Sequence, residues 1–99
     1  DQMKAVMITY NQALTEKVEY MLTKLGIKGY TQFPEIVGCG SNTGDPHLGT
    51  HTWPEINNAL LTVVEDEKVD ELFSKIKKID AVNEKVGIRA FVWDVLRTV

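Results

Sequence analysis

The sequence predicts an α+β fold in which four strands and two helices follow in the order β-α-β-β-α-β, as a single domain over residues 1–99. Four segments rich in β-branched and aromatic residues indicate strands, and two segments with apolar residues at helical spacing indicate helices. A stretch of about twenty residues with neither period separates the second and third strands. The composition, 43% hydrophobic and 25% charged, is ordinary for a globular domain.

The first strand and helix are predicted from residues 4–25. "KAVMITY" (4–10) is apolar and β-branched, as in a buried strand. Asn11 is a suitable N-cap for the helix that follows, and Gly26 is a natural C-terminal stop. One face of this helix carries its core residues, which are Leu14, Val18, Met21, Leu22 and Leu25.

"GYTQFPEIV" (29–37) predicts the second strand. Pro34 removes a ladder donor, so we expect an edge strand or a bulge there. The long irregular loop then runs from about 38 to 57. Loops of this length are usually functional, which predicts a recognition or switching element.

The second half of the chain repeats the pattern with a strand at 58–65, a helix at 66–80 and a strand at 88–96. The helix begins with acidic residues and ends with lysines, as the helix dipole prefers. Its predicted core residues are Val69, Leu72, Phe73, Ile76 and Ile79. The whole order is that of the ferredoxin-like sandwich, which places both helices on one face of the sheet.

Two strands are apolar on both sides, so the face without helices is predicted to be apolar as well. In the last strand the two sides are Ile88, Ala90 and Val92 against Phe91, Trp93 and Val95, and in the first they are Val6, Ile8 and Tyr10 against Ala5 and Met7. An exposed apolar face of several hundred Å² indicates an interface, which predicts oligomerisation. The alternative is that the central loop folds back over the sheet.

Charge and composition exclude several classes of protein. A net charge of −3 disfavours nucleic-acid binding. No apolar run approaches the roughly 20 residues of a membrane span, so we expect no direct membrane insertion. A single cysteine is compatible with a reducing compartment, which predicts a cytoplasmic protein.

The long loop concentrates potential ligands without a recognised motif. Cys39, His47 and His51 offer metal donors, but their spacing is not an established zinc pattern, and a strand cysteine with two loop histidines is the alternative. "GCGSNTGD" (38–45) offers backbone N–H groups to an anion, but it lacks a following helix and a Gly-Lys-Ser/Thr. No nucleophile has a specified base, so we expect no enzymatic activity.

Three motifs in correct order give the chain a resemblance to the PII family of signalling proteins. "LGIKGYTQ" (25–32), "EIVGCG" (35–40) and "RAFVWDV" (89–95) are similar to the family's "VGITGMT", "EVKGFG" and "KIFVFDV". The resemblance covers nearly the whole chain. The long loop (about 38–57) then corresponds to the family's T-loop, and the exit of the second helix to its B-loop.

The resemblance implies a homotrimer that binds an adenine nucleotide such as ATP or ADP between subunits. It also implies a T-loop that docks on a membrane transporter or a metabolic enzyme. The positions that match the family's nucleotide cleft are Thr31, Gly38, Gly40, Gly87 and Arg89.

The chain also departs from the family pattern. Its B-loop is only "KVGIR" (85–89), Ser41-Asn42 replaces an Arg-Gln pair, and the sequence stops at Val99, before the family's arginine-bearing final strand. These departures predict a divergent, PII-like member. The second hypothesis is a metal-responsive protein related to the trimeric CutA family, with Cys39, His47 and His51 as ligands of a divalent or soft metal.

Overall fold

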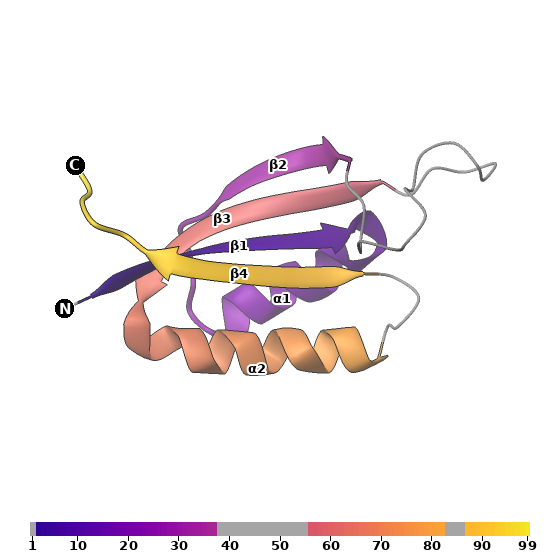
Figure 1. Cartoon of the computed structure of the whole chain (residues 1–99). Helices are drawn as coiled ribbons and strands as arrows, with labels where there is room; N and C mark the ends of the chain where they lie inside the picture. Colours follow the sequence, from indigo (N-terminus) through magenta and orange to yellow (C-terminus); the bar gives the residue numbers. More distant parts are fainter. Residues whose placement is uncertain (1, 38–55, 83–86) are drawn as a thin grey trace, which may run out of the picture.

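The computed structural model describes residues 2–37, 56–82 and 87–99. Its elements follow in the predicted order (Figure 1): β1 (Met3–Asn11), a 3-10 turn η1 (Gln12–Leu14), α1 (Thr15–Lys24), β2 (Thr31–Ile36), β3 (Asn57–Glu65), α2 (Asp66–Val82) and β4 (Ile88–Asp94). The ferredoxin-like α+β prediction is confirmed.

The strands form one antiparallel sheet in the order β2-β3-β1-β4. Figure 1 shows α1 and α2 on the same side of this sheet. The central strand β1 pairs with β3 along its whole length and with β4 from Lys4 to Tyr10. β2 and β4 are therefore the two edges.

The last strand is shorter than the predicted 88–96. The last residue pair of β4 joins Asp94 to Lys4, near the start of β1. Among the described strands, β1 is the only one that pairs with β4. Beyond this pair, Val95 makes one further backbone bond, from its N–H to the Met3 carbonyl at 3.1 Å. The assigned strand therefore ends two residues before the predicted end, although Val95 still bonds to Met3, the first residue of β1.

Both predicted ends of the first helix are confirmed. The Asn11 side chain accepts a hydrogen bond from Ala13 N at 2.9 Å, although it caps η1 rather than α1 itself. At the other end, Gly26 has φ +72°, in the left-handed region that favours glycine. Its N–H donates to the Thr23 carbonyl, and Ile27 N donates to the Leu22 carbonyl at 2.9 Å. These two bonds form a Schellman motif.

The core lies between the sheet and the helices. β1 contributes Val6, Ile8 and Tyr10, all at most 1% exposed. The predicted apolar face of α1 is entirely buried, and that of α2 is buried or partly buried. The strand alternation and the helical spacing therefore identified the core correctly.

The hydroxyl oxygen of Tyr10 is buried without a hydrogen-bond partner. Among the described residues it is the one buried polar side-chain atom in this state. Burial raises the pKa of this phenol above its usual 10.0, and the nearby amides of Gln32 and Asn58 only partly oppose this. The neutral phenol is therefore favoured in the folded state. Above pH about 10 the unfolded chain loses this proton first, so stability falls as pH rises.

We expect Tyr10→Phe to be at least as stable as the natural chain at pH 7, with a gain of up to about 1 kcal/mol, because it removes a buried unsatisfied hydroxyl. Its loss of stability above pH about 10 should also be smaller. Urea unfolding at pH 7 and pH 10.5 (roughly half a unit above the free phenol's pKa) measures both effects. Tyr20→Phe, at an exposed position, is the control and should change neither quantity. A Tyr10→Phe variant less stable at pH 7 would contradict this account.

Candidate functional site

One end of the sheet gathers the described residues that flank the two loops. There, β1 and β2 end, and β3 and β4 begin (Figure 1). Asn11 N donates to the Gly87 carbonyl at 3.0 Å, and Gln12 N donates to the Ile56 carbonyl at 2.9 Å. The end of β1 thus fixes the chain at the exits of both residues 38–55 and residues 83–86.

A bulge shapes β2 just before it reaches this end. The pairing register with β3 shifts between Phe33 and Ile36, around Pro34, as the sequence predicted for an edge strand or a bulge. Glu35 has φ +55°, a left-handed conformation that is strained for a residue with a side chain. Its N–H donates to Asn58 Oδ1 at 3.1 Å, which ties the bulge to β3.

Of the predicted nucleotide-binding residues, the structure describes Thr31, Gly87 and Arg89. Thr31 opens the edge strand β2, and Arg89 lies near the start of the opposite edge strand β4. All three are exposed. The other positions named from the sequence lie outside the described residues; they are Gly38, Gly40, Cys39, His47 and His51.

Within one chain, Thr31 and Arg89 do not come together. β3 and β1 lie between their strands, so three strand spacings of about 4.8 Å separate the two edges by roughly 14 Å. Thr31 is level with Met7 and Arg89 with Thr9, so they also occupy different rows of the sheet. The described residues predicted to bind nucleotide therefore fall into two groups at opposite edges of the sheet, which we call the candidate half-sites.

The half-site on β4 combines an open backbone with an accessible cation. A Cβ added at Gly87 would meet no atom of the residues in ranges 2–37, 56–82 and 87–99 within 4 Å, its chain neighbours aside. The Arg89 guanidinium donates to the Ile88 carbonyl at 2.7 Å and lies 3.4 Å from an Asp80 carboxylate oxygen. Because both side chains of this pair are half-exposed, water screens their attraction and a competing anion displaces Asp80 at little cost.

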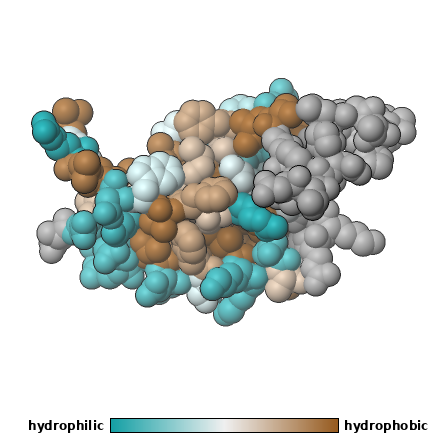
Figure 2. Space-filling view, in the orientation of Figure 1, coloured by the Kyte–Doolittle hydropathy of each residue, from teal (hydrophilic) through white to brown (hydrophobic). Residues whose placement is uncertain are grey.

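The sheet face opposite the helices is apolar, as predicted. Phe91 and Trp93 of β4 are 57% and 47% exposed. The register places them level with Met7 and Ala5 of β1, and with Leu61 and Val63 of β3. In the view of Figure 1 the strands lie in front of α1, and Figure 2 shows apolar residues across the centre of that view. We call this surface the open sheet face.

The open sheet face extends beyond the residues of β1 and β4 from which the sequence predicted it. Val63 and Phe33, each 42% exposed, extend it onto β3 and β2. β3 is apolar at both alternating positions, as "NALLTVVE" shows, so the same two-sided pattern was available in the sequence. Phe33 was not predicted to lie on this face, because the segment was interpreted only through the missing backbone donor of its neighbour Pro34.

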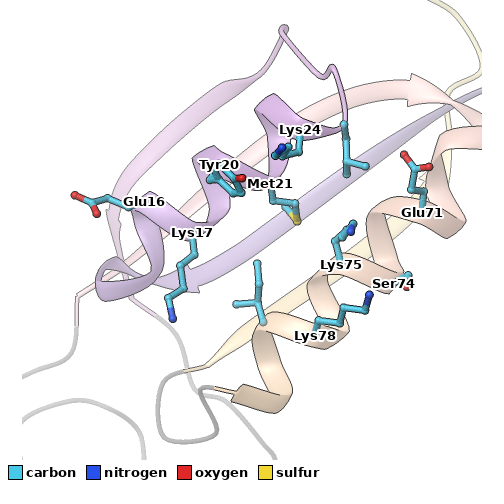
Figure 3. Close-up of a pocket in the computed structure, with 11 residues that line it drawn as sticks. Glu16, Lys17, Tyr20, Met21, Lys24, Glu71, Ser74, Lys75 and Lys78 are labelled. Atoms are coloured by element: carbon cyan, nitrogen blue, oxygen red, sulfur yellow. The ribbon is translucent and has the colours of Figure 1, made fainter.

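An open groove of about 1180 Å³ lies between the two helices, and nothing in the sequence pattern predicted it. Figure 3 shows its walls: Lys17 and Met21 on α1, and Lys75 and Lys78 on α2. The sequence predicted that the helix at 66–80 ends with lysines. It could not show that lysines of α1 lie across from them, because that depends on how the two helices pack on the sheet.

Two negative findings concern the described residues only. In ranges 2–37, 56–82 and 87–99, no three His, Cys, Asp or Glu side chains are grouped so as to hold a metal ion. No helix within those ranges is long and apolar enough to span a membrane.

Comparison with known families and structures agrees with this geometry. The family described as nitrogen regulatory protein P-II matches residues 3–99. A search of curated protein sequences gave no match.

Solved structures of similar fold include three from different bacteria. GlnK of B. subtilis is 21% identical, with a TM-score of 0.71 over 100% of this chain and 90% of that one. CPII of Thiomonas intermedia, bound to ADP, AMP and bicarbonate, is 23% identical, with a TM-score of 0.70 over 96% and 93%. A PII-like signaling protein of Thermus thermophilus is 24% identical, with a TM-score of 0.68 over 95% and 87%. B. subtilis GlnK has also been solved as an ATP complex.

The strained bulge residue gives a direct test of the loop-end geometry. We expect Glu35→Val to lower the free energy of unfolding by about 1 kcal/mol, because a β-branched side chain fits the left-handed region poorly. Glu35→Gly should not lower it, since glycine adopts positive φ freely. Urea unfolding of both variants measures the difference. Equal stability of the two variants would show that residue 35 does not hold this conformation.

Proposed function

The chain belongs to the nitrogen regulatory protein P-II family, and from this premise we propose that it is a trimeric regulator of a partner protein. One domain over residues 1–99 binds an adenine nucleotide between subunits and reports it through the T-loop segment at about 38–57. The partner is a membrane transporter or a metabolic enzyme, met in the cytoplasm. The protein itself catalyses no reaction, binds no nucleic acid and does not insert into the membrane.

The observation that carries this proposal is the open sheet face. Phe91 and Trp93 each leave about half of a large aromatic surface in water. Burying the exposed part of both amounts to about 200 Å² and on the order of 5 kcal/mol per subunit. Self-association through this face supplies that burial, and it leaves the helices pointing outward.

The positions of the half-sites support a cleft between subunits. The β2 edge carries Thr31 and the β4 edge carries Arg89, roughly 14 Å apart in one chain. In a closed ring of subunits, the β2 edge of one chain meets a different edge of its neighbour. One nucleotide then contacts Thr31 with Gly38 and Gly40 of one subunit, and Gly87 with Arg89 of the next.

The chemistry at β4 suits a phosphate. A guanidinium is the side chain best matched to a phosphate group, to which it donates two parallel hydrogen bonds. Gly87 lets the ligand approach the backbone, because no side chain stands there. The ADP, AMP and ATP bound in the solved structures of CPII and GlnK make an adenine nucleotide the natural candidate ligand.

Regulation follows from the shared end of the sheet. The exits of residues 38–55 and 83–86 are both tied to the end of β1 by backbone hydrogen bonds. A nucleotide held there interacts differently with different T-loop conformations, and it favours those that it binds best. The partner protein then binds the T-loop conformation that the nucleotide favours.

The metal-responsive alternative has no support among the described residues, and its ligands Cys39, His47 and His51 lie outside them. It enters the test below as the competing outcome.

Assembly through the open sheet face predicts that Phe91→Asp dissociates the trimer. A carboxylate at the centre of a buried apolar interface has no partner there, whereas in a single chain position 91 is solvated. Light scattering coupled to size exclusion measures the mass, and circular dichroism checks the fold. Tyr20→Asp, an equally exposed aromatic on α1, is the matched control and should remain trimeric. A trimeric Phe91→Asp protein would place the interface elsewhere.

Nucleotide sensing is tested by calorimetry with ATP, ADP and AMP, and separately with Zn²⁺ and Cu²⁺. Arg89→Ala should weaken nucleotide binding by about 10- to 100-fold, since it removes a charged hydrogen-bond donor. Gly87→Ala should weaken binding with little loss of folding stability, because the added methyl group meets no other described residue within 4 Å. Asp80→Ala is the control and should bind at least as tightly.

Two results would count against the nucleotide site. Binding unaffected by Arg89→Ala would remove β4 from it. Metal binding that is abolished by His47→Ala and His51→Ala, with no nucleotide binding, would favour the metal-responsive alternative instead.

A further inference from the structure

The groove between α1 and α2 lies on the side of the sheet opposite the open sheet face (Figure 1). Assembly through the open sheet face therefore leaves the groove exposed on the outside. Its lining includes none of the residues assigned to the proposed nucleotide site, although Lys17 and Lys78 lie on the parts of α1 and α2 that approach the loop end of the sheet. Neither subunit association nor the proposed nucleotide site uses it.

The groove is positively charged in an acidic protein. Its lining includes four lysines, Lys17, Lys24, Lys75 and Lys78, against two glutamates, Glu16 and Glu71. The chain as a whole has a net charge of −3. Gathering like charges is unfavourable unless an opposite charge offsets it.

The described carboxylates offset only part of this charge. Ion pairs between described residues involve Lys4 and Arg89, and none includes Lys24, Lys75 or Lys78. Glu71 precedes Lys75 by one helical turn, which compensates that lysine in part. The residues one turn before Lys24 and Lys78 are Tyr20 and Ser74, so these two lysines are the best placed for an acidic partner.

The groove also offers apolar surface. Tyr20 is 63% exposed, and Lys24 Nζ lies 5.5 Å from the centre of its ring. Ile79 is partly exposed on α2, whereas Met21 and Leu25 line the groove but belong to the core and are each only 5% exposed. A small inorganic anion would use the lysines but leave Tyr20 and Ile79 uncovered.

We propose that this groove is a docking site for an acidic amphipathic helix of a partner protein, with apolar residues on one face and carboxylates beside them. Lysines from both helices would pair with the carboxylates, and the apolar face would cover Tyr20 and Ile79. On α2 the lining runs from Glu71 to Ile79, about 12 Å, which matches roughly two turns of a bound helix. The groove would thus give the protein a second contact with a partner protein, in addition to the T-loop contact proposed above.

The experiment uses a fluorescent peptide of 17 residues, the length of α2, with leucines at i, i+3, i+4 and i+7 spacing and glutamates elsewhere. A second peptide of the same composition has the leucines scrambled. Fluorescence anisotropy with the full-length chain should show saturable binding of the first peptide, at least about tenfold tighter than of the second, because only the first presents an apolar face.

The decisive variants are a matched pair of double charge reversals. Lys24→Glu with Lys78→Glu changes both sides of the groove and should weaken peptide binding by about tenfold or more. Lys28→Glu with Lys77→Glu makes the same change in net charge at exposed positions outside the groove lining, and should change binding by less than about twofold. All four sites are exposed, and circular dichroism confirms that both variants fold.

Several outcomes would overturn the proposal. If neither peptide binds, the groove does not hold this kind of helix. If the scrambled peptide binds as tightly, or if both double variants lose binding equally, the attraction is general electrostatics. If inorganic polyphosphate or phosphatidylglycerol vesicles bind with the same dependence on Lys24 and Lys78 and displace the peptide, the groove recognises anions rather than an amphipathic helix.

Discussion

The structure depends on one constraint, which is that the central strand β1 is apolar on both of its faces. Val6, Ile8 and Tyr10 are covered by the helices, which can reach only one side of the sheet. Ala5 and Met7 lie on the other side, in a surface that the chain's described helices do not cover. An exposed apolar surface on that side, and a pair of helices that face away from it, follow from this arrangement.

The sequence predicted the fold because its local patterns agree with one another. The spacing of apolar residues on α1, the cap at Asn11 and the stop at Gly26 all indicate the same helix, and the structure contains all three. Element ends were less certain. The final strand stops at Asp94 although Val95 and Leu96 continue the apolar pattern. Its neighbour β1 begins at Met3, close to this point, and where a neighbouring strand begins is not visible in the sequence of β4.

The candidate site was predictable in its chemistry but not in its geometry. Thr31, Gly87 and Arg89 were identified through family motifs, yet nothing in their spacing showed that Thr31 and Arg89 occupy opposite edges of the sheet. The helical groove was missed for a related reason. Lys24 and Lys78 are 54 positions apart in the sequence, and only the packing of α1 and α2 against a common sheet places them on one surface.

The bulge in β2 has a consequence for the solubility of the chain before it assembles. An exposed sheet edge is a template for other strands, and proteins commonly protect it with proline and bulges. Pro34 and Glu35 do this for β2, leaving only Thr31 to Phe33 as a regular edge. β4 has neither device: it runs regularly from Ile88 to Asp94 and carries exposed aromatic residues. In the single chain, β4 is therefore the edge most prone to aggregation, and the proposed self-association would also serve to bury its exposed aromatic residues.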